Sequence, residues 1–267
     1  MKTKLIVNSS LFLAFIASFL VTVFSCGIVQ NFFIAITVNL ATILVTVNFV
    51  DYLFKRQDAS KSKQKEEHAI LRYHRTLEMF ISRYIYYFNV ITRPVEFACK
   101  ENDWNSFNVS SEIINKEFKL SDMQDMYFAG FGRGRGETSL ERYYSSETKL
   151  YDRFVNILDS IDFEFHPDLG KTILEFIEEY NWNDMKYLLL PLQTEYHNEK
   201  TGKKVATSKM VSDFLKNYKG NPETDIQGEY KNKGFWTGVF IFYFSLKNKS
   251  KFIEKYLSII SEIKKQK

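Results

Sequence analysis

The fold of this chain is decided by two apolar runs near its start, LIVNSSLFLAFIASFLVTVF at residues 5–24 and IVQNFFIAITVNLATILVTVNF at residues 28–49. Three residues, Ser25, Cys26 and Gly27, separate the runs. Each run has the roughly 20 residues that an α-helix needs to cross the core of a bilayer. Neither contains an Asp, Glu, Lys, Arg or His, so its burial in hydrocarbon desolvates no charge. The sequence therefore predicts a transmembrane helical hairpin within residues 1–54.

Basic residues beside the hairpin predict its orientation. Lys2 and Lys4 precede the first run, and residues 55–65, which follow the second, hold five Lys or Arg residues. Short loops rich in Lys and Arg stay in the cytoplasm, so we expect both termini to be cytoplasmic and the turn to lie outside. The expected localisation is the inner membrane of a bacterium, as a multi-pass protein whose first partner is the lipid bilayer.

Two alternative interpretations of the first run are a cleaved signal peptide and a lipoprotein signal at Cys26. A signal peptide has an apolar region of roughly 7–15 residues, which is shorter than this run. A lipoprotein signal needs a small residue where this chain has the bulky Phe24. The hairpin is the preferred interpretation, because a second apolar run follows at once.

Small and polar residues form one stripe on each run. At 100° per residue, five residues of the second run fall within about 80°: Asn31, Ala35, Asn39, Thr42 and Thr46. Four residues of the first run recur at four-residue spacing, which lets transmembrane helices approach closely: Ser10, Ala14, Ser18 and Thr22. We expect these stripes to pack against each other or against neighbouring copies, so that the chain forms a homo-oligomer. The alternative is that the Asn and Thr stripe lines a water-filled path, which requires several hairpins.

The rest of the chain predicts an all-α cytosolic domain, residues 66–267, behind a basic juxtamembrane linker at residues 55–65. Residues 57–65 of this linker are either a polar connection or a helical extension of the second run. The mean hydropathy of the whole chain is −0.25 despite the hairpin, so this part is distinctly polar. Apolar residues at three- and four-residue spacing predict its main helices, at residues 66–92, 139–161, 167–180, 209–218 and 251–265. Shorter helices fit residues 110–118 and 183–190, and the polar residues 195–204 predict an exposed loop.

Residues 235–246, FWTGVFIFYFSL, form a third apolar run. At about a dozen residues it is too short to span a bilayer, and it is typical of a buried core segment, either helix or strand. Basic residues on both sides of the run also suit a segment that rests on an anionic membrane surface. Both interpretations stay open at this point.

The residue types that commonly carry catalysis or bind metal ions are scattered along the chain. The four histidines are dispersed and form no His-Glu-x-x-His pattern, and the two cysteines, Cys26 and Cys99, do not show the spacing of a zinc site. The sequence has no Gly-x-Ser-x-Gly elbow and no Walker loop. We therefore expect no enzyme, no catalytic residue, no metal site and no cofactor.

Residues 130–137, GFGRGRGE, are the most unusual polar segment. Alternating glycines free the backbone, two arginines supply bidentate donors, and the helix expected to follow adds positive potential at its N-terminus. Such a segment can contact a phosphate or a nucleic acid, here through Gly132, Arg133, Gly134 and Arg135. The alternative interpretation is a flexible surface connection.

Residues 39–56, NLATILVTVNFVDYLFKR, resemble the second helix of uncharacterised bacterial proteins with two transmembrane helices. Proteins of this general build include membrane effectors of retron-type anti-phage systems. The resemblance covers about fifty of the 267 residues and implies a membrane effector. It transfers no active-site residue to this chain.

The expected function is that of a bacterial inner-membrane effector in anti-phage defence, without enzymatic activity. Its hairpins are expected to associate and perturb the membrane once the cytosolic domain is released or triggered. The cytosolic domain is expected to sense, or to be restrained by, a partner, either a regulatory protein or a nucleic acid. Two alternatives explain the same residues: a non-toxic membrane-tethered scaffold or adaptor, and an unrecognised membrane-anchored enzyme.

Overall fold

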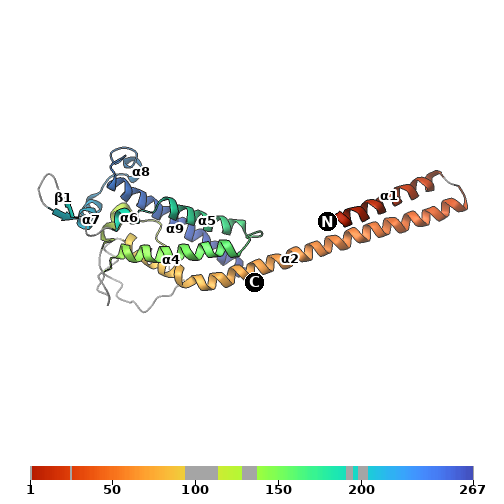
Figure 1. Cartoon of the computed structure of the whole chain (residues 1–267), viewed down its shortest axis with the longest axis horizontal. Helices are drawn as coiled ribbons and strands as arrows, with labels where there is room; N and C mark the ends of the chain where they lie inside the picture. Colours follow the sequence, from red (N-terminus) through yellow and green to blue (C-terminus); the bar gives the residue numbers. More distant parts are fainter. Residues whose placement is uncertain are drawn as a thin grey trace. The chain divides into compact units, whose positions relative to one another are not determined.

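The computed structural model of the chain describes residues 2–24, 26–93, 114–127, 137–190, 195–197 and 204–266. These residues are mostly helical, with one short ribbon of two strands (Figure 1). Contacts within the chain divide it into residues 1–65 and residues 66–267. We call the first part the hairpin unit and the second part the helical unit.

The hairpin unit consists of α1, Lys2–Phe24, and the first part of α2, Ile28–Thr92. Gly27 has a positive φ of 69°, a backbone conformation that suits a residue without a Cβ atom. The first helical hydrogen bond of α2 follows directly, from the backbone N–H of Asn31 to the Gly27 carbonyl at 3.2 Å. The three-residue separation between the apolar runs is therefore enough for the chain to reverse.

Helix α2 continues beyond the second apolar run, which was expected to end near Phe49, and it reaches Thr92. No glycine or proline interrupts residues 28–93, and Pro94 follows. Asp51 and Lys55 form an ion pair one helical turn apart, at 3.2 Å. The predicted linker at residues 55–65 is therefore part of a helix of 65 residues.

One helix in the described part of the chain is long and apolar enough to cross a membrane. It lies in α2, within Gln30–Thr92, where an 18-residue window has a mean hydropathy of 2.1 and no buried residue. Residues Ser10–Phe24 of α1 form a shorter apolar helix. Length and composition thus agree with a membrane-associated N-terminal part, while the topology of the hairpin stays a prediction.

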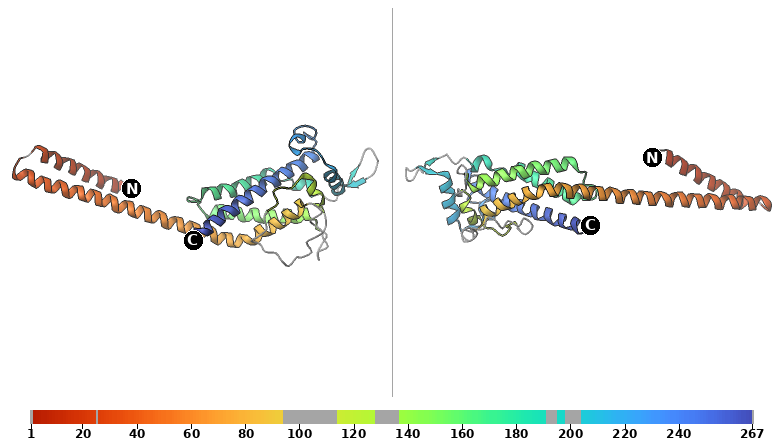
Figure 2. Two further views of the ribbon diagram at one scale, coloured as in Figure 1. Left: turned by 180° about the vertical axis from the view of Figure 1, so that it is seen from behind. Right: turned by 90° about the horizontal axis from the view of Figure 1, so that it is seen from below.

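Within the described residues, the helical unit consists of the last part of α2 and nine further elements, which confirms that this described part is predominantly α-helical. Their bounds are η1 Leu120–Asp125, α4 Ser139–Ser160, α5 Pro167–Trp182, α6 Lys186–Leu189, β1 Glu195–His197, β2 Lys204–Ala206, α7 Thr207–Asn217, α8 Pro222–Asp225 and α9 Phe235–Lys265. Helices α4, α5 and α9 lie beside the end of α2 as a bundle (Figures 1 and 2).

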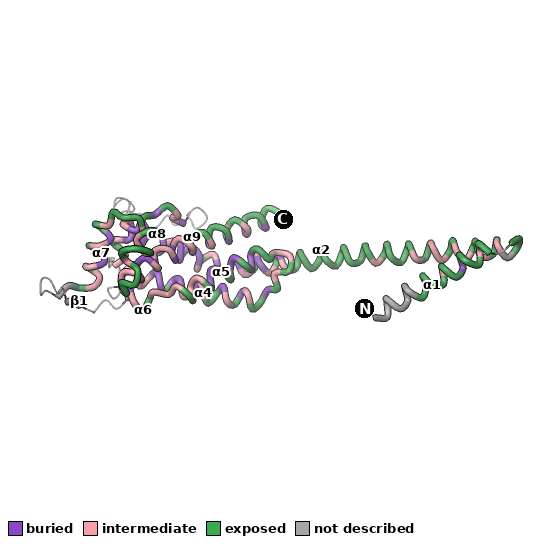
Figure 3. Tube along the Cα trace, turned by 90° about the horizontal axis from the view of Figure 1, so that it is seen from above, coloured by how far each residue is buried: buried purple, intermediate pink, exposed green. Residues whose placement is uncertain are grey.

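The core of the helical unit is aromatic. Tyr84 of α2 and Phe176 of α5 meet edge to face with ring centroids 5.8 Å apart, and Phe154 of α4 packs on Phe176 in the same way at 5.2 Å. The three rings are buried. Figure 3 shows that buried residues recur along the helices of the helical unit, as the three- and four-residue spacing predicts for the inner face of each helix. Burial of such a stripe is what stabilises a helix in a bundle.

The third apolar run, residues 235–246, belongs to the core and not to a strand. It is the start of α9, which continues through the predicted helix 251–265 for a total of 31 residues. Val239, Phe240, Phe242 and Leu246 are all 1% exposed or less. Among the two interpretations of this run, buried core is the one that the structure supports.

Two short segments differ from expectation. Residues 195–204 were expected to be a loop, but β1 and β2 pair in antiparallel register, with Tyr196 opposite Val205. Three residues on each side are too few to produce a readable alternation in the sequence. Of the helix expected at 110–118, the described residues 114–118 are not helical.

Candidate functional site

The hairpin unit holds a cluster of three hydroxyl groups between its two helices. The Oγ of Ser18 in α1 lies 2.8 Å from the Oγ1 of Thr37 in α2, and the Oγ1 of Thr22 lies 3.3 Å from the same atom. Thr22 and Thr37 also donate to carbonyls one turn earlier in their own helices, at 2.9 and 2.8 Å. Ser18 is only 6% exposed. We call these three residues the hydroxyl cluster.

The hydroxyl cluster joins α1 to α2 by polar contacts that need no water. Gln30 adds a contact near the turn, where its side-chain amide donates to the carbonyl of Thr22 at 3.4 Å. In a medium without water, hydroxyl groups that bond to one another and to backbone carbonyls avoid the cost of an unpaired polar group. Two residues of the predicted α1 stripe, Ser18 and Thr22, therefore contact α2 within the same hairpin. Ser10, in the same stripe, is exposed.

The stripe predicted on the second run does not face α1. Its five members are exposed: Asn31, Ala35, Asn39, Thr42 and Thr46. The residues of α2 that α1 covers are half-buried instead: Gln30, Phe33, Ile36, Thr37, Leu40, Ala41 and Leu44. At 100° per residue these two sets point in directions about 180° apart. Of the two expected partners of the α2 stripe, α1 is therefore not the one, because Thr37, which the sequence analysis did not select, contacts α1 instead. Packing against neighbouring copies stays a prediction.

The polar side chains of the exposed stripe differ in how they are satisfied. Thr42 donates to the carbonyl of Val38, one turn earlier, at 2.9 Å. Asn31 and Asn39 are exposed, and within the described part of the chain their side-chain amides make no hydrogen bond. The stripe thus presents two open amides on the side of α2 that faces away from its own hairpin. We call it the outer stripe.

The glycine–arginine segment lies outside the described residues, including Gly132, Arg133, Gly134 and Arg135. The helix that follows it is described. Thr138 caps α4: its Oγ1 accepts from the backbone N–H of Glu141 at 3.2 Å, and the Glu141 carboxylate accepts from the Thr138 N–H at 2.7 Å. The Glu141 carboxylate therefore lies at the N-terminus of α4. The positive potential of this helix end was one of the three reasons to expect a phosphate or nucleic acid at the glycine–arginine segment.

The helical unit contains a buried ion pair that the sequence analysis missed. The Nζ of Lys249 in α9 lies 2.7 Å from the Oε1 of Glu147 in α4, and the two side chains are 2% and 1% exposed. The Tyr143 hydroxyl donates to the same oxygen at 2.5 Å and lies 3.3 Å from the Tyr84 hydroxyl. Burial, followed by the charge of Glu147, raises the pKa of Tyr143 well above its ordinary value, so it stays a donor.

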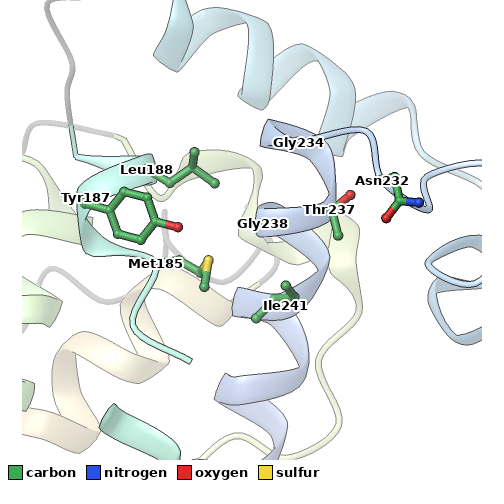
Figure 4. Close-up of a pocket in the computed structure, with 8 residues that line it drawn as sticks. All are labelled: Met185, Tyr187, Leu188, Asn232, Gly234, Thr237, Gly238 and Ile241. Atoms are coloured by element: carbon green, nitrogen blue, oxygen red, sulfur yellow. The ribbon is translucent and has the colours of Figure 1, made fainter. Parts of the chain in front are cut away.

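The described part of the helical unit also has an open pocket of about 450 Å³ beside α6 and the start of α9 (Figure 4). Its lining is mostly apolar or uncharged: Met185, Tyr187, Leu188, Asn232, Gly234, Thr237, Gly238 and Ile241. Tyr187 is the one titratable side chain in that lining. Neither Glu147 nor Lys249 is among the residues that line this pocket.

Comparisons with known proteins add one relative of unknown function. No family model matches the chain, and no solved structure matches it. An uncharacterized protein of Dictyostelium discoideum is 27% identical over 193 residues, which is 71% of this chain. The matched part is 60% of that protein's length, so the chain corresponds to about three fifths of its relative.

Proposed function

We propose that the protein is an inner-membrane effector of a bacterium, acting in anti-phage defence as the resemblance of residues 39–56 suggests. Both termini lie in the cytoplasm and the hairpin unit crosses the membrane twice. A regulatory protein or nucleic acid, bound to the helical unit, restrains the hairpins, and a chain expressed without this partner is released. The released hairpins then associate and perturb the bilayer.

The observation that carries this proposal is the arrangement of polar and apolar groups in the hairpin unit. Large apolar side chains cover its surface: Phe24 is 82% exposed, Ile28 is 90% exposed and Val45 is 70% exposed. The hydroxyl cluster lies between the two helices. A surface with many exposed apolar side chains is costly in water and favourable in lipid, where helices contact through small and hydroxyl side chains.

The decisive experiment compares the native chain with a chimera in which an unrelated two-helix anchor of the same topology replaces residues 1–54. Each chain is induced in bacteria while a potential-sensitive dye reports the membrane potential, and fractionation verifies that both chains reach the membrane. We expect depolarisation with the native hairpin and none with the chimera, because the proposed toxicity resides in the hairpin.

Two results would contradict the proposal. Native protein that accumulates in the membrane fraction without depolarising the cells identifies a tethered scaffold or adaptor instead. Native protein that stays in the soluble fraction excludes both the effector and the scaffold, because each requires insertion of the hairpin unit.

A further inference from the structure

We propose that the outer stripe of α2 binds the outer stripe of a second copy, so that two hairpins associate through α2 against α2 with α1 on the outside. This inference rests on the proposed membrane location and names the partner and the contact surface. The observation behind it is that the outer stripe faces directly away from α1, while its amides remain open.

Depth in the membrane makes Asn39 the central residue of this surface. It follows Ile28 by 11 residues, which is about 16 Å along a helix axis and close to the middle of a hydrocarbon core about 30 Å thick. Asn31, three residues into α2, lies near the turn and its amide can reach the interface. The short side chain of Asn39 cannot reach either surface from mid-membrane.

The structure distinguishes Asn39 from other polar residues of α2 that satisfy themselves. Thr42 donates to the Val38 carbonyl at 2.9 Å, and Asn48 donates to the Leu44 carbonyl at 2.8 Å. Asn39 makes no such bond within the described part of the chain. An amide left unpaired in hydrocarbon is costly, so a partner that supplies both a donor and an acceptor is favoured.

A second copy supplies that partner by symmetry. Both copies insert with the same topology, so a two-fold axis along the membrane normal brings each residue to the same depth as its counterpart. The amide of Asn39 is both donor and acceptor and therefore pairs with itself. The outer stripe also has the spacing of a helix pair, four, three and four residues between positions 35, 39, 42 and 46. This alternation is typical of the contact residues between two parallel helices in a left-handed coiled coil.

Disulfide crosslinking in membranes tests the surface directly. In full-length protein with Cys26→Ser and Cys99→Ser, single cysteines are placed in the outer stripe (Ala35→Cys, Thr42→Cys, Thr46→Cys). Matched cysteines are placed on the side of α2 (Ile34→Cys) and on the face toward α1 (Phe33→Cys, Leu44→Cys). We expect dimers after mild oxidation for the three stripe positions and background levels for the other three.

A second measurement tests the role of the amide. Asn39→Leu, combined with Thr46→Cys, should weaken dimer formation by about 3- to 20-fold, the range for one hydrogen bond between membrane helices. The matched control Ile34→Leu with Thr46→Cys should leave dimer formation unchanged. Equal crosslinking in both variants, or strongest crosslinking outside the stripe, overturns the inference.

Parallel measurement of membrane potential separates this inference from the proposed function. Stripe-specific dimers without depolarisation support the contact surface and contradict the effector. Depolarisation by a native chain that forms no stripe dimers contradicts the contact surface and leaves the effector function in place.

Discussion

Glu147 and Lys249 each occupy a position that the apolar spacing of their helices assigns to the core. In α9 the buried residues Leu246 and Ile253 flank Lys249 at three- and four-residue distances, and in α4 Tyr143 and Leu150 flank Glu147 in the same way. A charged residue within an apolar stripe is a signal that the sequence analysis did not use. Two such residues on different helices are able to pair, and the structure brings these two into contact.

Removing one member of this ion pair should destabilise the helical unit strongly. Lys249→Met leaves the Glu147 carboxylate buried without its cation, and we expect a loss of about 3–5 kcal/mol in the free energy of unfolding. The double variant Glu147→Leu with Lys249→Met removes both charges and should recover most of that loss. Chemical unfolding of full-length protein in detergent micelles measures both, and equal losses in the single and double variants would contradict the prediction.

His74 gives the helical unit a dependence on pH. Its Nδ1 lies 3.1 Å from the hydroxyl of Tyr256, and its Nε2 lies 3.3 Å from the carboxylate of Glu78, which also pairs with Lys264. Burial lowers the pKa of His74 to about 4, with the nearby charge of Lys264 acting in the same direction and Glu78 opposing it.

The sign of this dependence follows from the lowered pKa. In the unfolded state, His74 has its ordinary pKa near 6.5. Between pH 6.5 and about 4, His74 is therefore protonated in the unfolded state and neutral in the folded state. We therefore expect the free energy of unfolding to fall by up to about 3 kcal/mol across that window as the pH decreases. His74→Gln should remove this contribution, while the exposed His68→Gln serves as the matched control and should retain it.

At the scale of the helices, the sequence predicted which segments are helical better than where the helices end or whether two of them are continuous. Pro167 was expected to open a helix and α5 begins there, because proline suits the first helical position. Of the two alternatives for residues 57–65, a polar linker or a helical extension of the second run, the structure has the helical extension, since residues 50–65 include strong helix formers and no glycine or proline. The apolar run at residues 235–246, whose secondary structure was left open, and the helix expected at 251–265 form one helix, α9, because the Lys-rich residues 247–251 between them are also helical.

For the whole molecule, thiol labelling tests the proposed orientation of the chain in the membrane. Cys26 is exposed in the hairpin turn, and Cys99 lies after α2. A thiol reagent that cannot cross membranes should label Cys26 in intact cells whose outer barrier is permeabilised, and should not label Cys99. Cys26→Ser should abolish the labelling. Labelling of Cys99 in Cys26→Ser cells would reverse the predicted orientation.

Local pattern along the chain was sufficient to predict two apolar helices around a short turn and a helical remainder, because hydropathy and the 3.6-residue period act between near neighbours. Which polar residues meet required the tertiary structure. Ser18 contacts Thr37 and the outer stripe faces away from α1, because the relative rotation of two helices depends on all of their side chains together. The pair of Glu147 and Lys249, 102 residues apart in sequence, likewise exists only because α4 and α9 pack in one bundle.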